Sequence, residues 1–255
     1  MRWAFSQLLP EISSFMMGLK LICFDLDGTL LHGRNLAQTI VTTCERVAYD
    51  FPQYDAQKLL EANRAIWPDF WAETAEAWTM GQMTGREHSL LAWRRTFAEY
   101  GGDVFDDVVA FASAVQLAEY HATHQLYGDV MPTLYRLREH GLKLALVTNG
   151  ARDTQRGKIK ALDLDQWFDV MALSGELGMA KPNPQIFEFV LTRLQIAPHE
   201  AVHVGDNLKT DVKGALVSGL QAVWLNRKRR PNNLRGVHPD EAITGLGELL
   251  RLLCL

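Results

Sequence analysis

The sequence predicts an α/β fold: a Rossmann-like parallel sheet core flanked by helices, with an inserted all-α domain. Three observations predict it. Short apolar runs alternate with helical patterns through the second half of the chain. Residues 33–125 contain helical patterns but no convincing strand. Acidic and hydroxyl residues follow the apolar runs, at the place where parallel sheets bind ligands.

The strands are predicted from short apolar runs, which are typical of strands buried on both faces. The runs are LKLICF (19–24), LKLALV (142–147), FDVMAL (168–173), AVHV (201–204) and LQAVWL (220–225). Helical patterns lie before and between the later runs and after the last one, where Thr244 is a possible N-cap. They cover 130–140, 152–163, 184–195 and 208–218. Because strands alternate with helices, we expect parallel pairing through crossover helices.

The inserted segment is predicted to be helical throughout. Pro68 suits the first turn of a helix, and Gly101 and Gly102 end another. We therefore divide the chain into an N-terminal extension (1–18), an α/β core domain (19–32 and 126–255) and a helical cap domain (33–125). The predicted cap helices cover 35–49, 55–66, 68–79, 86–100 and 104–122.

One helical face of the insertion carries large aromatic side chains. Trp67, Phe70, Trp71 and Trp78 recur there at helical spacing, together with Ala75. Such a stripe favours the core of a helical bundle over a wall that faces a substrate.

Composition and charge exclude several classes of partner. The net charge of -4 gives no reason to expect nucleic acid, and no apolar run approaches the ~20 residues of a membrane helix. The three cysteines are widely spaced and form no CxxC pair, which favours a reducing cytoplasm over a disulfide framework or zinc site. The basic run 227–230 (RKRR) favours a solvated loop over a binding patch.

The residues that follow the strands form a set suited to phosphate chemistry. Parallel strands bring their carboxyl ends to one edge, so these residues should converge. Clustered carboxylates repel one another, and a hard cation such as Mg²⁺ relieves that repulsion. A lysine, a hydroxyl and backbone N–H groups can bind phosphate oxygens. The set comprises Asp25, Asp27, Thr148, Asn149, Lys181, Asp206 and Asp211.

Two aspartates two residues apart can divide the work of phosphoryl transfer. Asp25 follows the apolar strand directly and is the better candidate for a nucleophile that forms an aspartyl-phosphate. Asp27 lies in the turn, from which it can protonate the leaving oxygen and later activate water. Gly28 allows that turn to be tight.

Four short motifs occur in order along the chain: FDLDGTL, LVTNG, the lysine of MAKPNPQIF, and HVGDNLKTD. In this order they resemble motifs I to IV of the haloacid dehalogenase (HAD) superfamily, in the phosphatase branch that carries a helical cap after motif I. The motifs span residues 21–211, nearly the whole predicted core.

The resemblance implies a role for each matching residue. Asp25 would be nucleophile and Mg²⁺ ligand, and Asp27 would be general acid/base and a ligand through its backbone carbonyl. Thr148 with its neighbour Asn149 would bind phosphate, and Lys181 would orient the nucleophile and the phosphate. Asp206 would be the third metal ligand. Asp211 would support either Lys181 or a metal-bound water.

Several further residues are weaker candidates. His32 and Arg34 follow motif I and could touch the leaving group, although a hinge position is favoured. Arg86 could enter the cleft and pair with a charged substrate group, but a surface position at a helix start is favoured. His121 and His124 have a spacing that can bind metal, yet no acidic third ligand is evident, which favours packing or solvent exposure.

The function expected is a Mg²⁺-dependent phosphatase for phosphate monoesters of small metabolites. A 2-haloacid dehalogenase is the alternative, although a leaving halide needs no proton from Asp27. A phosphomutase also stays open, because sequence cannot measure how well a cap excludes water. A phosphonate hydrolase would need a cap lysine for a Schiff base, and residues 33–125 contain only Lys58. A non-catalytic binding module would be expected only if the acids of the set were replaced.

Overall fold

The computed structural model describes residues 18–32 and 36–255 of the 255-residue chain. The predicted N-terminal extension, apart from Gly18, and the candidate Arg34 lie outside the described residues. No helix in the described ranges combines the length and apolar character needed to cross a bilayer.

The predicted parallel sheet is confirmed, and it has six strands in the order β3-β2-β1-β4-β5-β6. The central strand β1 pairs with β2 and β4 in parallel, with Leu21 opposite Lys143 and Ala201. The sixth strand was not predicted, because its three residues, EAI, lie at the sheet edge and are too short and mixed in polarity to form an apolar run. The strands are β1 (Leu21–Phe24), β2 (Lys143–Thr148), β3 (Val170–Leu173), β4 (Ala201–Gly205), β5 (Gln221–Leu225) and β6 (Glu241–Ile243).

Helices cover both faces of the sheet because β1 alternates its side chains between two cores. Ile22 and Phe24 pack with α5 (Val130–Glu139), α6 (Arg152–Ala161) and α10 (Leu246–Leu252). Leu21 and Cys23 belong to the opposite core, with the helices α8 (Gln185–Leu194) and α9 (Lys213–Val217). Two short helical segments complete this layer, α7 (Ser174–Leu177) and the π-helix Leu208–Val212.

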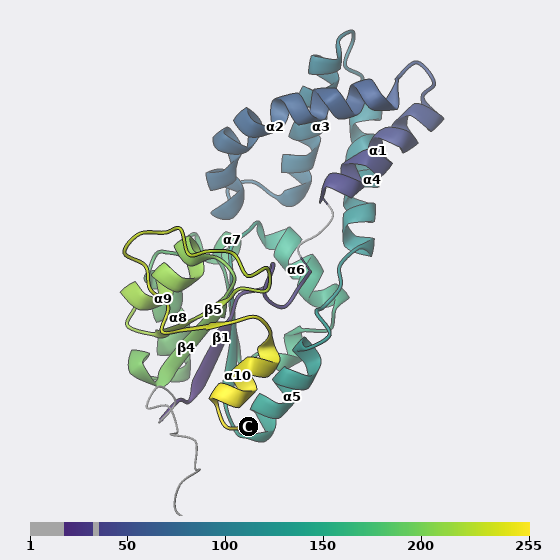
Figure 1. The fold of residues 1–255 in the computed structure, drawn as a ribbon. Helices are drawn as coiled ribbons and strands as arrows, with labels where there is room; N and C mark the ends of the chain where they lie inside the picture. The colour runs from purple at the N-terminus through teal and green to yellow at the C-terminus, as the bar shows by residue number, and fades with distance from the viewer. Residues whose placement is uncertain (1–17, 33–35) are drawn as a thin grey trace, which may run out of the picture.

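Four helices lie between β1 and α5 in the chain and pack around a core of their own. Figure 1 shows them as a separate layer beyond the end of the sheet from which α6 and α7 begin. Trp93 and Phe97 of α3 meet Ile40 and Val47 of α1 and Leu59 of α2 in this core. The four helices, here called the helical insertion, are α1 (Leu36–Asp50), α2 (Ala56–Thr79), α3 (Gly85–Tyr100) and α4 (Asp106–Ala122).

The helix boundaries correct two predictions. The predicted helices 55–66 and 68–79 are one helix, α2, with Pro68 inside it. A proline in a helix interior costs about 3 kcal/mol, and here the packing of α2 along α3 and α1 offsets that cost. At the C-terminus, Gly245 is the N-cap of α10, while the hydroxyl of Thr244 donates to Glu248.

One ion pair ties three distant segments to the turn that follows β1. Arg227, after β5, donates to both carboxylate oxygens of Asp129 at the start of α5, over 2.8 and 2.9 Å. Asp129 also accepts from the backbone N–H of Leu246, at the start of α10. The guanidinium lies 3.8 Å from the ring centroid of Tyr127 and donates to the carbonyl of Thr29. Through Arg227 the turn after β1 is therefore connected to the starts of α5 and α10 and to the loop after β5.

The packing of α5 predicts a stability contrast between two adjacent residues. Leu134 is fully buried against the sheet, whereas Tyr135 is 56% exposed. Leu134→Ala is expected to lower the free energy of unfolding by about 2–5 kcal/mol, because it removes buried methyl groups and leaves a cavity. Tyr135→Ala is the control and should change it by less than about 0.5 kcal/mol. Urea denaturation measures both, and equal losses would contradict the assignment of the core face.

Candidate active site

The predicted acids do converge at the carboxyl ends of the central strands. Asp25 follows β1 and is buried, while Asp206 and Asp211 follow β4. One carboxylate oxygen from each of the three lies within 4.8 Å of the others. A cavity of about 130 Å³ there is lined by all but the weakest of the predicted site residues: Asp25, Asp27, Thr148, Asn149, Lys181, Asp206 and Asp211, with Asn207 and Thr210.

Gly28 allows the turn after β1 to approach the turn after β4. Its φ is +87°, and a Cβ at this position would lie 2.6 Å from a carboxylate oxygen of Asp206. A larger residue would therefore push Asp206 away from Asp25.

Lys181 joins the two buried carboxylates of the cluster. Its ammonium lies 2.7 Å from Asp25 and 2.6 Å from Asp211. Burial alone would lower the pKa of Lys181, but the two carboxylates raise it above its ordinary value. The Asn149 side chain fixes the lysine backbone, since its amide donates to the carbonyl of Lys181 and its oxygen accepts from the N–H, each over 2.9 Å. Asn149 was predicted to bind phosphate, but both polar atoms of its side chain are engaged by the backbone of Lys181.

The oxygens of Asp211 are occupied by donors from the protein. One oxygen accepts from Lys181 and from Nε2 of His203, and the other accepts from the backbone N–H of Asn207. Burial opposes its charge, but Lys181 and His203 hold the pKa of Asp211 below its ordinary value. Asp211 therefore supports the lysine, and the oxygens of Asp25 and Asp206 are those left to face an ion.

His203 is a site residue that the sequence reasoning missed. It lies inside β4, where AVHV was interpreted only as a buried strand. Burial lowers the pKa of His203, so the ring is neutral and its Nε2–H donates to Asp211. The available signal was a histidine in the middle of an otherwise apolar strand, shortly before the motif aspartates Asp206 and Asp211.

The pKa values of Asp25 and Asp206 are raised, whereas that of Asp211 is lowered. Burial raises the pKa of Asp25. The charge of Lys181 acts against this rise, and the neighbouring acids Asp211 and Asp206 add to it. Desolvation by the surrounding protein and repulsion from Asp211 raise the pKa of Asp206 to about 6, although its side chain is still accessible to solvent. Two acids with raised pKa values and unfilled oxygens fit a hard divalent cation, which would favour their ionised forms.

The carboxylate of Asp27 is bound by a second buried lysine that the sequence reasoning also missed. Lys158 donates to both oxygens of Asp27, over 2.9 and 2.8 Å, and Gln155 donates to one of them. Burial opposes the charge, but Lys158 and these hydrogen bonds hold the pKa of Asp27 below its ordinary value. Gln155 also donates to the hydroxyl of Thr148 over 2.6 Å. The usable signal was the i, i+3 spacing of Gln155 and Lys158, which places both side chains on one face of α6.

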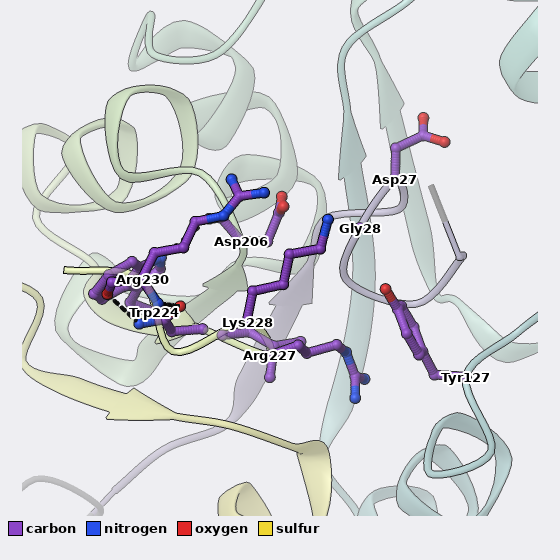
Figure 2. A pocket seen from close by; sticks show the side chains of 10 residues that line it. Asp27, Gly28, Tyr127, Asp206, Trp224, Arg227, Lys228 and Arg230 are labelled. Carbon is purple, nitrogen blue, oxygen red and sulfur yellow. Dashed lines mark hydrogen bonds between the residues drawn. The ribbon is translucent and has the colours of Figure 1, made fainter. Parts of the chain in front are cut away.

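The basic run after β5 is exposed at Lys228, Arg229 and Arg230, as expected of a solvated loop, and it also forms one wall of a pocket. Figure 2 shows Arg230 and Lys228 extending toward Asp206 and Gly28, while the carboxylate of Asp27 points away from them. The pocket has a volume of about 230 Å³. Arg227 points the other way, toward Tyr127, because its charge is used by the ion pair with Asp129.

The weaker candidates lie mainly outside the acidic cluster. His32 lies where the chain leaves the core, with its ring 3.8 Å from that of Tyr127. Arg86 is exposed, and its backbone N–H donates to Asp153. Burial lowers the pKa of His124 to about 4, and its ring packs against Tyr120 and His121. Among the described residues, only the three aspartates are close enough to hold a metal ion together.

The aromatic stripe of α2 has two faces, which corrects the prediction that it forms the core of the bundle. Phe70 is fully buried, as expected. Trp67, Trp71 and Trp78 instead line a cavity of about 430 Å³ between the helical insertion and α6. Trp71 is 39% exposed.

Known proteins with similar sequences and folds cover nearly the whole of this chain. A phosphoserine phosphatase of Thermus thermophilus is 34% identical over 250 residues, which cover 91% of this chain and 98% of the relative. The solved structure of a HAD phosphatase from Thermococcus onnurineus is 31% identical, with a TM-score of 0.63, and the match covers 92% of this chain and 98% of that one. A 2-haloacid dehalogenase from Pseudomonas syringae is 26% identical, with a TM-score of 0.66 and coverage of 92% and 98%.

The fold is thus common to phosphatases and dehalogenases, and the class of enzyme follows from the sequence relatives. These include glyceraldehyde 3-phosphate phosphatases and N-acylneuraminate-9-phosphatases, of which the chain spans about half to three fifths. The prediction of a hydrolase of the phosphoric monoester class is confirmed at this level. The model of the haloacid dehalogenase-like hydrolases matches residues 19–219, and the chain belongs to that family.

Proposed function

We propose that this protein is a Mg²⁺-dependent phosphatase that hydrolyses phosphate monoesters of small metabolites through an aspartyl-phosphate. The observation that carries the proposal is the arrangement of Asp25 and Asp27. Asp25 faces Lys181 and Asp206. Asp27 is bound by Lys158 of α6, whose ammonium lies 5.6 Å from the ring centroid of Tyr120 in the helical insertion. The phosphatases among the relatives support the same reaction class.

The acidic cluster has the composition of a Mg²⁺ site. Asp25 and Asp206 would hold the ion, together with the backbone carbonyl of Asp27, while Asp211 keeps its bonds to Lys181 and His203. The ion would neutralise charge on the phosphate oxygens. Lys228 and Arg230 add positive charge beside Asp206, on the side where a phosphate dianion would enter.

In the first step a carboxylate oxygen of Asp25 attacks phosphorus, and the bond from phosphorus to the leaving oxygen breaks. Asp27 delivers a proton to that oxygen. Lys181 fixes the orientation of Asp25 and donates to the transferred group, and the Thr148 hydroxyl is the further donor at the end of β2. In the second step Asp27 takes a proton from water, which attacks the aspartyl-phosphate and releases inorganic phosphate and Asp25.

Asp27 has to exchange partners during this cycle. While it is paired with Lys158 its ionised form is stabilised, so it holds no proton for the leaving oxygen. We propose that the Asp27 carboxylate leaves Lys158 and takes up a proton from solvent before the helical insertion closes over the substrate. It returns that proton to solvent when it pairs with Lys158 again after the second step. Gln155 links the two states, because it contacts both Asp27 and Thr148.

The helical insertion would act as the cap of this active site. We place the boundary of the cap domain at 33–125, because α1 to α4 form their own core and the chain leaves and re-enters at neighbouring points, where the backbone N–H of His32 donates to Gln125. Closure would exclude bulk water from the aspartyl-phosphate. The three cysteines are unpaired, and we place the reaction in the reducing cytoplasm.

Removal of the nucleophile tests the proposed reaction. Against a panel of phosphorylated metabolites with Mg²⁺, Asp25→Asn is expected to lower kcat by at least about 10³-fold, because an amide cannot form the covalent intermediate. Chelation of the metal should abolish hydrolysis by the unaltered protein. The exposed Asp69 supplies the control, since Asp69→Asn should change nothing. Hydrolysis that survives both chelation and Asp25→Asn would refute the mechanism, and rapid chloroacid dehalogenation without Mg²⁺ would favour the alternative.

The role of Asp27 predicts a dependence on the leaving group. Asp27→Asn is expected to lower kcat/KM by about 10²–10⁴-fold for alkyl phosphates, whose leaving oxygen needs a proton. For 4-nitrophenyl phosphate, whose leaving group is a stable anion, the loss in the acid step should be far smaller. Steady-state kinetics on both substrates measure the contrast. Equal losses would show that Asp27 does not act as the general acid.

The raised pKa values predict how metal affinity changes with pH. Mg²⁺ binds the ionised carboxylates, and at pH 5 the pKa of about 6 at Asp206 leaves that group mostly protonated. The affinity for Mg²⁺ should therefore rise from pH 5 to pH 7.5. Below the pKa of Asp206, where binding of Mg²⁺ displaces one proton, the rise should be about tenfold per pH unit. Calorimetric titration measures the effect. In Asp206→Asn the binding should be weak at both pH values, and a pH-independent affinity in the unaltered protein would contradict the assignment.

A further inference from the structure

We infer that the cavity between the helical insertion and α6 binds the leaving group of the substrate, and that this group is a planar aromatic or heteroaromatic ring without a further charge. The inference rests on the proposed phosphatase function and names the substrate class of that site. The ring-binding residues are Trp67, Trp71 and Trp78 of α2 and Tyr120 of α4.

The cavity lies on the side of the site to which Asp27 delivers its proton. Asp153, Thr154 and Gly157 of α6 line it, and from the same helix Gln155 and Lys158 hold the Asp27 carboxylate. The Lys158 ammonium is 5.6 Å from the ring centroid of Tyr120, which also lines the cavity.

The opposite edge of the cavity reaches the loop that follows β2. A Cβ placed on Gly150 would lie 2.8 Å from Cη2 of Trp78, and Gly150 is two residues from Thr148. Because the Asp27 carboxylate points away from the Lys228–Arg230 pocket (Figure 2), the leaving group lies on the insertion side and not in that basic pocket.

The indoles of this cavity are not needed to fill the core of the insertion. That core is built from other residues of α1 to α4, and none of the three tryptophans is among its members. Trp67 and Trp71 lie almost parallel, with an interplanar angle of 13°, and Trp71 and Trp78 are 5.7 Å apart. Aromatic faces that remain partly exposed toward a cavity stack readily on a flat ring.

The charges around the cavity argue against a second anionic group on the substrate. No lysine or arginine belongs to its lining in the described part of the chain. Its one carboxylate, Asp153, accepts from the backbone N–H groups of Gly85 and Arg86. Burial lowers the pKa of His88 to about 4, so this ring is neutral at pH 7. A carboxylate or second phosphate entering here would lose its hydration, and the described residues of the lining offer no lysine or arginine to replace it.

The volume of about 430 Å³ lies within the range of small-molecule sites and admits one ring system. Specificity of this kind would set the chain apart from its relative that is a phosphoserine phosphatase, because phosphoserine carries a carboxylate and no ring.

The test compares four phosphate esters of primary alcohols, which share the chemistry of the leaving oxygen. They are benzyl, cyclohexylmethyl, 4-carboxybenzyl and ethyl phosphate, assayed with Mg²⁺ on the full chain. Benzyl phosphate is expected to have a kcat/KM about fivefold or more above cyclohexylmethyl phosphate, and more than tenfold above the 4-carboxybenzyl and ethyl esters.

Variants of Trp71 locate the effect in the cavity. Trp71→Ala should raise KM for benzyl phosphate about fivefold and leave ethyl phosphate unchanged, and Trp71→Phe should restore most of the difference. Tyr49, which is 80% exposed on α1, supplies the control substitution Tyr49→Ala. Equal effects of Trp71→Ala on both esters would show a structural role only and overturn the inference.

The outcomes separate this inference from the proposed function. Hydrolysis of ethyl phosphate at a rate equal to or above that of benzyl phosphate would overturn the substrate class and leave the phosphatase function standing. If no ester were hydrolysed, the phosphatase function would fail. In that case calorimetry with benzylphosphonate and ethylphosphonate still tests the cavity, and tighter binding of the aromatic compound that Trp71→Ala removes would uphold it.

Discussion

The buried contact of Lys181 with Asp25 and Asp211 is the interaction on which the rest of the site depends. Two carboxylates this close repel each other and lose hydration on burial, and one ammonium at 2.7 and 2.6 Å compensates both. Its partners come from the ends of β1 and β4, so the parallel register of the central strands sets the distances. The hydrogen bonds of Asn149 to the lysine backbone and of His203 to Asp211 hold this arrangement from outside.

A second buried lysine explains why two aspartates only two residues apart differ in charge state. Asp25 shares Lys181 with another acid and is buried, so its pKa is raised. Lys158 binds the carboxylate of Asp27 and also donates to the uncharged side chain of Gln155, and the pKa of Asp27 is lowered. In the proposed mechanism, separate cations would therefore support the chemistry at phosphorus and the proton transfer to the leaving group.

The surroundings of the site differ on its two sides. The β5 loop presents Lys228 and Arg230 beside Asp206, which suits the dianionic end of a phosphate ester. The helical insertion presents indole rings and a neutral imidazole, His88, which suit an uncharged organic group. A phosphate ester has this same polarity, and the acids to which we assign the chemistry, Asp25 and Asp27, lie between the two sides.

The sequence by itself determined the parallel sheet, the helical insertion and the identity of the converging acids, because apolar runs and motif spacing are local properties. The partners Lys158, Gln155 and His203 were decided only by the tertiary structure: α6 and β4 bring them to Asp27 and Asp211 from positions up to 131 residues away. The same holds for the tryptophans of α2, since periodicity gives one apolar face and cannot tell a core from a cavity wall. Local features, such as the spacing of Gln155 and Lys158, can mark a residue as unusual, but they do not identify its partner. Which neighbour a side chain meets is a property of packing between distant elements.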